Sequence, residues 1–275
     1  MLSALADAPP VAAPALALER VSRGFLDGAD RRPVLEGFSL GVAPGEFCAV
    51  VGPSGSGKST ILNLLAGLLA PDAGRVAVLG REGAAVLGAA AYMPQRDALL
   101  PWRTVEDNVA LPLRIAGVGA PEARARARRL LARFGLDAYA AGRPDALSGG
   151  MRQRVAFLRT VLPERGALLL DEPFGALDAL TRADLQDWLQ VAVRTGGQSV
   201  LLVTHDVEEA LYLADRVVVL SGRPARAVLD LVVGFARPRA RAVTLTPAFT
   251  GLKGEVFRAL GLRLDGGAAA ADGRA

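Results

Sequence analysis

One stretch of nine residues, "GPSGSGKST" at 52–60, restricts the fold of this chain more than any other. It follows the short apolar run "FCAVVG", which predicts a buried strand, and it leads into "KSTILNLLAGLL", which predicts a helix. Glycines between a strand and a helix let backbone N–H groups turn inward, and the positive end of the helix dipole then favours an anion there. We therefore expect an α/β fold in which this loop holds a phosphate group.

The loop matches the pattern G-x-x-x-x-G-K-[ST] at 52–59. In that pattern the lysine, here Lys58, reaches the β- and γ-phosphates of a nucleotide, and the hydroxyl of Ser59 binds Mg²⁺. The alternative is a glycine-rich turn that matches by chance, but the flanking strand and helix argue against it. The nucleotide-binding residues expected in this loop are Gly52, Pro53, Ser54, Gly55, Ser56, Gly57, Lys58, Ser59 and Thr60.

Composition narrows the class of protein further. The chain has 275 residues, of which 51% are apolar and 22% charged, which suits one large domain or a domain with an inserted lobe. Its longest apolar stretches fall short of the ~20 residues of a membrane-spanning helix.

Only Lys58 and Lys253 are lysines among 32 basic residues, and His205 is the only histidine, so both Lys58 and His205 merit attention. A net charge of +4 with 5% aromatic residues gives no support to a nucleic-acid partner. The single cysteine, Cys48, excludes an internal disulfide and fits a reducing compartment.

Short apolar runs alternate with helical patterns along most of the chain. Runs without period-two alternation, such as "ALLLDEP", are typical of parallel strands covered on both faces, so we expect a mostly parallel sheet wrapped by helices. The block at about 95–160 is nearly all helical and interrupts this order, which indicates an inserted helical lobe. Residues 1–15, rich in Ala and Pro, predict a flexible tail. Expected strands lie at 47–52, 74–80, 90–94, 167–173, 199–205 and 216–222, with an edge strand at 225–235. Expected helices lie at 58–69, 104–117, 121–135, 148–162, 180–196, 206–215 and 250–261; a loop is expected at 237–249 and a disordered tail at 265–275.

Four polar residues follow the predicted buried strands. Asp171 and Glu172 end "ALLLDEP", His205 ends "SVLLVTH", and Gln95 follows "AAYMP". Ligands of open α/β sheets bind at the carboxyl ends of the strands, which is where these residues fall. Asp171 can hold Mg²⁺ through water, Glu172 can orient or deprotonate a water that attacks a γ-phosphate, and Gln95 can join the Mg²⁺ ligands or position that water. Each residue alone also fits a plainer interpretation: an acidic turn, a helix-capping histidine or an uninvolved glutamine.

A second stretch, "LSGGMRQR" at 147–154, resembles another phosphate cradle. Ser148, Gly149 and Gly150 begin a predicted helix with a hydroxyl and unobstructed backbone N–H groups, which suits a γ-phosphate. Because the first loop already holds a triphosphate, the second cradle can close on the nucleotide of another copy paired head to tail, which creates two composite sites. The alternative is Ser148 as an ordinary N-cap followed by glycines of a loop.

Taken together, these motifs resemble those of the ATP-binding cassette (ABC) ATPases over about residues 16–235. The resemblance rests on six features in one order: "GPSGSGKST", Gln95, "LSGGMRQR", "LLLDEP", "GALD" and His205. It implies a P-loop NTPase of ABC type, with a mostly parallel sheet core, an N-terminal antiparallel β part and a helical subdomain at about 95–160. A C-terminal extension at 236–275, with a short helix and a disordered tail, would follow. The implied ligands are ATP and Mg²⁺, and the implied partner is a second copy that completes an ATP sandwich.

The resemblance also implies roles for individual residues. Residues 52–60 would form the Walker A loop, Gln95 would sense Mg²⁺ and link to a membrane partner, and residues 147–151 would be the signature that closes on the ATP of the other copy. Asp171 would be the Walker B carboxylate, Glu172 the catalytic base, Asp178 part of the D-loop and His205 the switch histidine at the γ-phosphate. Phe25 either stacks on adenine or is a core residue. Met151 stands where the family often has Gln, which leaves the backbone cradle at 148–150 intact.

A finer resemblance comes from "MPQRDALLPWRTVEDNV" at 93–109, together with "SGRPARAV" and the later "RPR". These segments look like those of importer ATPases for nitrate, sulfonates and taurine, and of related thiamine-precursor or riboflavin systems. The resemblance implies the energising subunit of an importer, peripheral at the cytoplasmic side of the inner membrane. It would act with transmembrane permease subunits and, through them, with a substrate-binding protein. We expect the surface at 95–102 to contact the permease, with Leu99, Leu100 and Trp102 as apolar anchors.

Three other functions are weighed against this one. A soluble ABC ATPase acting on nucleic acid or ribosomes usually has tandem cassettes or long coiled-coil insertions, which the sequence lacks. An unrelated P-loop kinase for a small molecule leaves "LSGGMRQR" and His205 unexplained. A cassette that binds ATP without turnover is disfavoured because the expected base, Glu172, is present.

Overall fold

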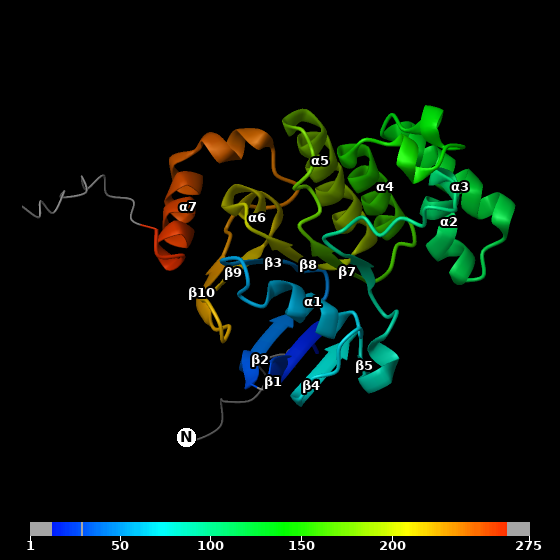
Figure 1. The fold of residues 1–275 in the computed structure, drawn as a ribbon. Helices are drawn as coiled ribbons and strands as arrows, with labels where there is room; N and C mark the ends of the chain where they lie inside the picture. Colours follow the sequence, from blue (N-terminus) through cyan, green and yellow to red (C-terminus); the bar gives the residue numbers. More distant parts are fainter. Residues whose placement is uncertain (1–12, 29, 263–275) are drawn as a thin grey trace, which may run out of the picture.

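The computed structural model describes residues 13–28 and 30–262, which form two β-sheets and the helices around them (Figure 1). A four-stranded antiparallel sheet has the order β2-β1-β4-β5, and a six-stranded sheet has the order β10-β9-β3-β8-β7-β6. The antiparallel strands are β1 (Leu16–Asp27), β2 (Asp30–Val42), β4 (Ala73–Val78) and β5 (Arg81–Glu82). The larger sheet contains β3 (Phe47–Val51), β6 (Ala91–Met93), β7 (Ala167–Asp171), β8 (Ser199–Thr204), β9 (Arg216–Leu220) and β10 (Ala227–Val232). Its strands are parallel except β10, which pairs antiparallel with β9 at the edge.

Seven α-helices accompany these strands in the described residues. They are α1 (Lys58–Leu65), α2 (Val105–Ile115), α3 (Ala120–Arg133), α4 (Gly149–Val161), α5 (Ala179–Gly196), α6 (Val207–Leu213) and α7 (Pro247–Ala259). Within this part of the chain, every helix is too short or too polar to cross a bilayer.

The six-stranded sheet separates two hydrophobic clusters. Successive side chains of a strand point to opposite faces, so Phe47, Ala49 and Val51 of β3 belong to one cluster, and Cys48 and Val50 belong to the other. The first cluster includes residues of α4, α5, α6 and α7; the second includes residues of α1 and the antiparallel sheet (Figure 1). Burial on both faces explains why β3, β7 and β8 are apolar without alternation.

The helical lobe predicted at about 95–160 contains α2, α3 and most of α4. The side chain of Thr104 caps α2 by accepting a hydrogen bond from the Asp107 N–H, at 3.1 Å. Charged pairs join α2 to α3: Arg124 lies 2.9 Å from Asp107, and Arg128 lies 2.5 Å from Glu106. Helix α4 then runs from the lobe into the core, where its apolar side chains are buried.

One sequence-based expectation is wrong in detail, and another left the partner strand open. The run at 74–80 was expected to be a strand, and the structure pairs it as β4 antiparallel with β1, with Leu18 opposite Val76. An apolar run predicts burial and does not specify its partner strand. The expected loop at 237–249 contains a 3₁₀ helix, Arg241–Leu245, and α7 begins at Pro247 rather than at 250. The Thr246 side chain caps α7, and proline suits the first turn of a helix.

At the two ends of the chain, part of the expected structure falls outside the described residues. These parts are residues 1–12 of the expected N-terminal tail and the expected disordered tail at 265–275. Ala15, assigned to the tail, is buried and donates its N–H to the carbonyl of Val42 at 2.8 Å. Ordered structure therefore starts at least one residue before the expected boundary.

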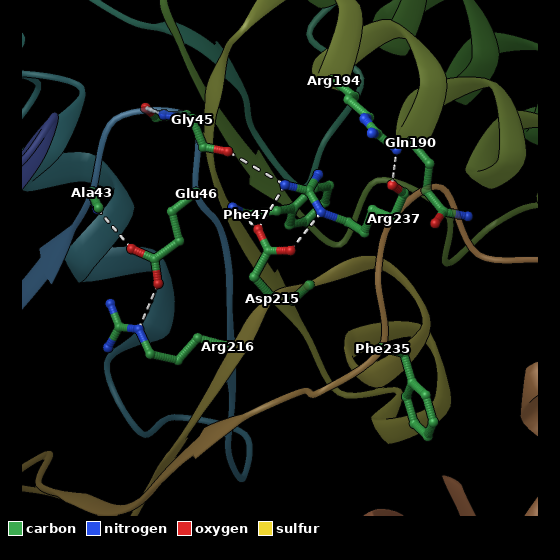
Figure 2. Close-up of polar contacts among 12 residues, drawn as sticks. Ala43, Gly45, Glu46, Phe47, Gln190, Arg194, Asp215, Arg216, Phe235 and Arg237 are labelled. Atoms are coloured by element: carbon green, nitrogen blue, oxygen red, sulfur yellow. Dashed lines mark hydrogen bonds and ion pairs between the residues drawn. The ribbon is translucent and has the colours of Figure 1, made fainter.

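The segment that follows β10 is held against the base of the larger sheet by Arg237 (Figure 2). Its guanidinium donates to both carboxylate oxygens of Asp215, at 2.7 and 2.6 Å, and to the carbonyl of Gly45 at 3.3 Å. It also lies 5.4 Å from the centroid of the Phe47 ring, within the range of a cation–π contact. The same Asp215 carboxylate accepts a hydrogen bond from the Phe47 N–H at 2.9 Å, so one ion pair joins the C-terminal segment to the start of β3.

Arg239, two residues further on, is buried against the end of α6. Its guanidinium donates to the carbonyls of Leu211, Tyr212 and Ala214, at 3.1, 2.9 and 2.9 Å. The last carbonyls of a helix have no partner within the helix, so this side chain supplies their donors. Burial lowers the pKa of Arg239 to about 10. This value is still well above neutral pH, so the side chain is cationic there. The motif "RPR" thus joins the C-terminal segment to two different parts of the core.

Candidate active site

The glycine-rich loop connects the end of β3 to the start of α1. Gly55 and Gly57 have φ angles of 79° and 98°, values that favour glycine. A Cβ atom at Gly57 would lie 2.8 Å from Cγ1 of Val34 on β2, closer than packing allows. Gly57 is also the N-cap of α1 and provides no side-chain acceptor. The backbone N–H groups of the first helical turn are thus left for a ligand at this helix end.

Lys58 lies over the loop rather than extending into solvent. Its Nζ donates to the carbonyls of Gly52 and Pro53, at 2.7 and 2.8 Å. Burial lowers the pKa of Lys58, and the nearby carboxylates Glu172 and Asp171 oppose that effect. The hydroxyl of Ser56 is buried without a hydrogen-bond partner among the described residues. A phosphate oxygen is a suitable partner for such a donor, so the loop fits the group that its sequence predicts.

Asp171 and Ser59 provide oxygen atoms next to this loop. Asp171 ends β7 at 3% exposure and is hydrogen-bonded to the Ser59 side chain. Burial raises its pKa, whereas the Ser59 hydrogen bond and Lys58 lower it. Between residues 13 and 262, Ala29 excepted, no group of three His, Cys, Asp or Glu side chains is arranged to hold a metal by itself. A carboxylate and a hydroxyl completed by phosphate oxygens and water suit Mg²⁺, so the residues present fit this ion.

Glu172 lies between Gln95 and His205. Its Oε2 accepts a hydrogen bond from Gln95 Nε2 at 3.2 Å, and its Oε1 lies 3.2 Å from His205 Nδ1. The Glu172 backbone has φ of 48°, an uncommon value for a side-chain-bearing residue, and its N–H donates to the carbonyl of Val203 at 2.9 Å. Strained backbone of this kind is concentrated at functional sites. Three residues from separate strand ends are thus brought together at one edge of the sheet.

The stretch at 147–154 begins α4 as expected. Ser148 is the N-cap, and its hydroxyl accepts a hydrogen bond from the Met151 N–H at 3.3 Å. Gly149 and Gly150 follow in the first turn, and a Cβ at Gly150 would lie 3.2 Å from the carbonyl of Ala176. In the described chain, Ser148, Gly149 and Gly150 form no hydrogen bond with the loop at 52–60 of the same copy.

The exposure of Phe25 and of the three expected apolar anchors bears on their expected roles. Phe25 is 39% exposed on β1, with the Arg23 guanidinium 5.1 Å from its ring centroid, so the core alternative is wrong. Of the expected apolar anchors, Leu99 is buried in the core and cannot be an exposed contact. Trp102 is 69% exposed and Leu100 is half-buried. Of the three expected anchors, only these two are accessible to a partner.

Sequence reasoning missed the residues that connect α4 to the strand ends. Gln153 is buried and donates from Nε2 to the carbonyls of Glu172 and Pro173, at 3.3 and 3.2 Å. Arg159 donates to the carbonyls of Asp97 and Ala98, both at 2.7 Å, in the segment that follows Gln95. The available signal was weak, because Gln153 and Arg159 lie in a helix that carries several other polar residues.

Comparison with known proteins identifies the family. The model of the family described as ABC transporter matches residues 35–175. The taurine import ATP-binding protein TauB of Pseudomonas aeruginosa strain UCBPP-PA14 is 48% identical over 230 residues, which cover 84% of this chain and 88% of that protein. TauB of Chromobacterium violaceum is 44% identical over 248 residues, which cover 88% and 94%.

A solved structure agrees with these sequence relatives. It is the dimeric, post-hydrolysis state of the ATP-binding cassette MJ0796 bound to ADP and Pi, with 29% sequence identity and a TM-score of 0.74. The match covers 80% of this chain and all of that chain. The expected ABC-type fold, with its antiparallel β part, parallel core and helical lobe, is confirmed. The chain belongs to the ABC transporter family, as one of its ATP-hydrolysing ATP-binding cassettes.

Proposed function

We propose that this chain is the ATP-hydrolysing subunit of an importer for a small sulfonate of the taurine type. The observation that carries the hydrolytic part is the contact of Glu172 with both Gln95 and His205, beside the glycine-rich loop. The printed names of relatives at 44–48% identity support the import of taurine. The resemblance of residues 93–109 to nitrate, sulfonate and taurine importer ATPases supports the same class of solute.

In this proposal the glycine-rich loop and Lys58 bind the phosphates of ATP. Glu172 accepts a proton from the attacking water, and its hydrogen bond with Gln95 and its contact with His205 orient the carboxylate for that task. His205 is 67% exposed, so its ring is open to a bound phosphate while it contacts Glu172. Ser59, Asp171 and Gln95 would hold Mg²⁺, which neutralises charge on the β- and γ-phosphate oxygens during phosphoryl transfer.

Two copies would enclose two ATP molecules head to tail. Ser148, Gly149 and Gly150 of one copy would close on the γ-phosphate held by the loop of the other copy. The open first turn of α4 supports this arrangement, because its N–H groups and the helix dipole favour an anion. The solved relative MJ0796 is a dimer bound to ADP and Pi. ATP would favour the closed dimer by binding it more tightly than the open one.

The membrane partner would bind the surface around Leu100 and Trp102. A large exposed tryptophan next to a half-buried leucine is typical of an interface anchor. The subunit would then lie at the cytoplasmic face of the inner membrane on permease subunits, which receive solute from a substrate-binding protein. We expect Trp102→Ala to weaken capture of this chain by its permease, whereas Ile115→Ala, which removes a similarly exposed side chain of the helical lobe, leaves capture unchanged.

The test of the catalytic and dimer assignments uses purified Glu172→Gln with and without Mg-ATP. Loss of a general base lowers turnover by about 10²–10⁴-fold, and trapped ATP should convert monomer to dimer in size-exclusion chromatography. Adding Ser148→Arg should abolish the dimer while nucleotide binding persists. Turnover in Glu172→Gln equal to that of the unmodified protein contradicts the assigned base.

The solute class is tested in cells of the source organism that lack this chain. Growth on taurine as the sole sulfur source should be lost, be restored by the unmodified chain and not be restored by Glu172→Gln. Loss of growth only when nitrate, riboflavin or a thiamine precursor must be imported would replace taurine by that solute and leave the ATPase assignment intact.

A further inference from the structure

The turn between β9 and β10, residues 221–226 with the sequence "SGRPAR", has no part in the mechanism above. It is nevertheless built against the glycine-rich loop. The carbonyl and Cβ of Leu220, which precede the turn, would both lie 3.1 Å from a Cβ at Gly52. Ala225 is buried at 1% exposure and donates its N–H to the carbonyl of Val34 at 2.9 Å. Val34 is also the residue that contacts Gly57, so one residue of β2 touches both the turn and the loop.

Internal hydrogen bonds fix the conformation of this turn. The N–H of Ser221 donates to the carbonyl of Arg226 at 2.9 Å, and the Ser221 hydroxyl accepts the N–H of Arg226 at 3.1 Å. The same hydroxyl donates to the carbonyl of Gly222 at 3.0 Å. Arg223 therefore projects from a fixed backbone.

The side chain of Arg223 reaches the glycine-rich loop directly. Its Nε donates a hydrogen bond to the carbonyl of Gly55, and three of its guanidinium atoms would lie 3.8–4.0 Å from a Cβ at that glycine. Gly55 has φ of 79°, so its peptide group occupies an orientation that few residues adopt. Any larger side chain at position 55 would be strained by this φ angle, although a Cβ there would meet the guanidinium only at ordinary van der Waals distance.

The charge of Arg223 is not neutralised within the described chain. Among residues 13–28 and 30–262 it forms no ion pair with a carboxylate, and its one hydrogen bond is to Gly55. The guanidinium therefore contributes positive charge beside the loop that no carboxylate offsets, and such charge favours an anion bound there.

We propose that Arg223 is a positioning residue for nucleotide binding, acting through the carbonyl of Gly55. By holding that carbonyl outward, Arg223 opposes a flip of the peptide that would aim an oxygen at the phosphates. The N–H groups of the loop then converge on the anion, and the guanidinium adds its positive charge. This role adds a residue outside the glycine-rich motif to the phosphate site. It depends on nucleotide binding by the loop and does not depend on the permease, the solute or the second copy.

The experiment compares Arg223→Gln with Arg226→Gln by titration of a fluorescent ADP analogue and by ATPase kinetics. Arg226 is a matched control because it is exposed in the same turn and its side chain contacts neither the loop nor an acidic residue in the described structure. Loss of one hydrogen bond to a charged donor corresponds to about a tenfold change in affinity. We expect Arg223→Gln to raise Kd for ADP and KM for ATP about tenfold, with kcat within about twofold and Tm without nucleotide unchanged. Arg226→Gln should match the unmodified protein.

Conservative replacement separates positioning from general damage to the fold. Arg223→Lys keeps a cation that can donate to Gly55, so it should recover at least half of the lost affinity on a logarithmic scale. Lys58→Ala, which removes the lysine of the loop itself, should abolish binding and identifies the signal as coming from this site. Equal Kd values for the unmodified protein, Arg223→Gln and Arg226→Gln overturn the inference, as does an equal loss in Arg223→Gln and Arg226→Gln.

Discussion

Glu209 is a buried carboxyl whose titration should change the stability of the fold. It lies on α6 at 6% exposure, where its Oε2 accepts a hydrogen bond from Gln186 Nε2 at 3.0 Å, and it is also hydrogen-bonded to the side chain of Thr204. Burial raises the pKa of Glu209 to about 7, and Asp206 raises it further, whereas the hydrogen bonds and Arg182 lower it. The folded protein therefore holds this proton at a pH where the unfolded chain has released it.

The sign and size of the effect follow from proton linkage. Between the ordinary pKa of 4.5 and the folded value of about 7, the folded state binds more protons than the unfolded state, so stability falls as pH rises through that range. Stabilisation from Glu209 is complete below pH 4.5 and lost above pH 7. Each pH unit between the two values corresponds to about 1.4 kcal/mol. Between pH 5 and pH 8 we expect a loss of about 2.5 kcal/mol in the free energy of unfolding.

The assay is urea denaturation at pH 5 and pH 8, without nucleotide, for the unmodified protein and Glu209→Gln. Glutamine keeps the shape and the hydrogen-bonding capacity of the protonated carboxyl and does not titrate. The unmodified protein should lose about 2.5 kcal/mol more than Glu209→Gln over this interval. Glu208→Gln is the matched control, since Glu208 is exposed and paired with Lys253 at 2.8 Å; its loss should equal that of the unmodified protein. Equal losses in Glu209→Gln and the unmodified protein would refute the reasoning.

Three further substitutions test the loop, the C-terminal segment and the link between α4 and the strand ends. Gly57→Ala, at φ 98° with a contact of 2.8 Å, should weaken ADP binding by more than about 100-fold in calorimetry; unchanged affinity would show that the loop accepts a side chain there. Arg239→Met removes the donors of three helix-end carbonyls and should lower the free energy of unfolding by about 2–4 kcal/mol in urea; a loss below 1 kcal/mol would show that water replaces it. Gln153→Leu removes both hydrogen bonds to the backbone around Glu172 and should lower kcat about tenfold with Kd for ADP unchanged; a change in Kd alone would mean that Gln153 serves the loop instead.

The central strands and the glycine-rich loop were predictable because their signals are local. A buried parallel strand is apolar throughout, and the residue that follows it lies at the carboxyl edge of the sheet whichever strands are its neighbours. This is why Gln95, Glu172 and His205 could be expected near the loop before their pairing was known. Which strand pairs with which, by contrast, depends on residues that are far apart in the sequence. The run at 74–80 indicates a strand, but nothing within it indicates that β4 pairs antiparallel with β1.

The C-terminal segment illustrates a second limit of sequence reasoning. Arg237 and Arg239 were recognisable only as part of an importer-like pattern, since neither has a periodic or spacing signal that indicates a partner. In an extended segment, residues two apart reach different surroundings once the chain turns at a proline between them. Arg237 pairs with Asp215, which precedes β9, whereas Arg239 reaches the end of α6.

These contacts bear on where the cassette ends. The resemblance to ABC ATPases implied a domain at 16–235 with an extension after it. Yet Phe249 and Val256 of α7 are buried in the same cluster as Phe47 of β3, and Arg239 supplies the donors at the end of α6, the helix that begins two residues after His205. A segment that completes both the main core and the helix next to a candidate site residue is part of the folding unit rather than an appendage to it. We therefore propose that the cassette extends through α7, with its boundary near residue 260.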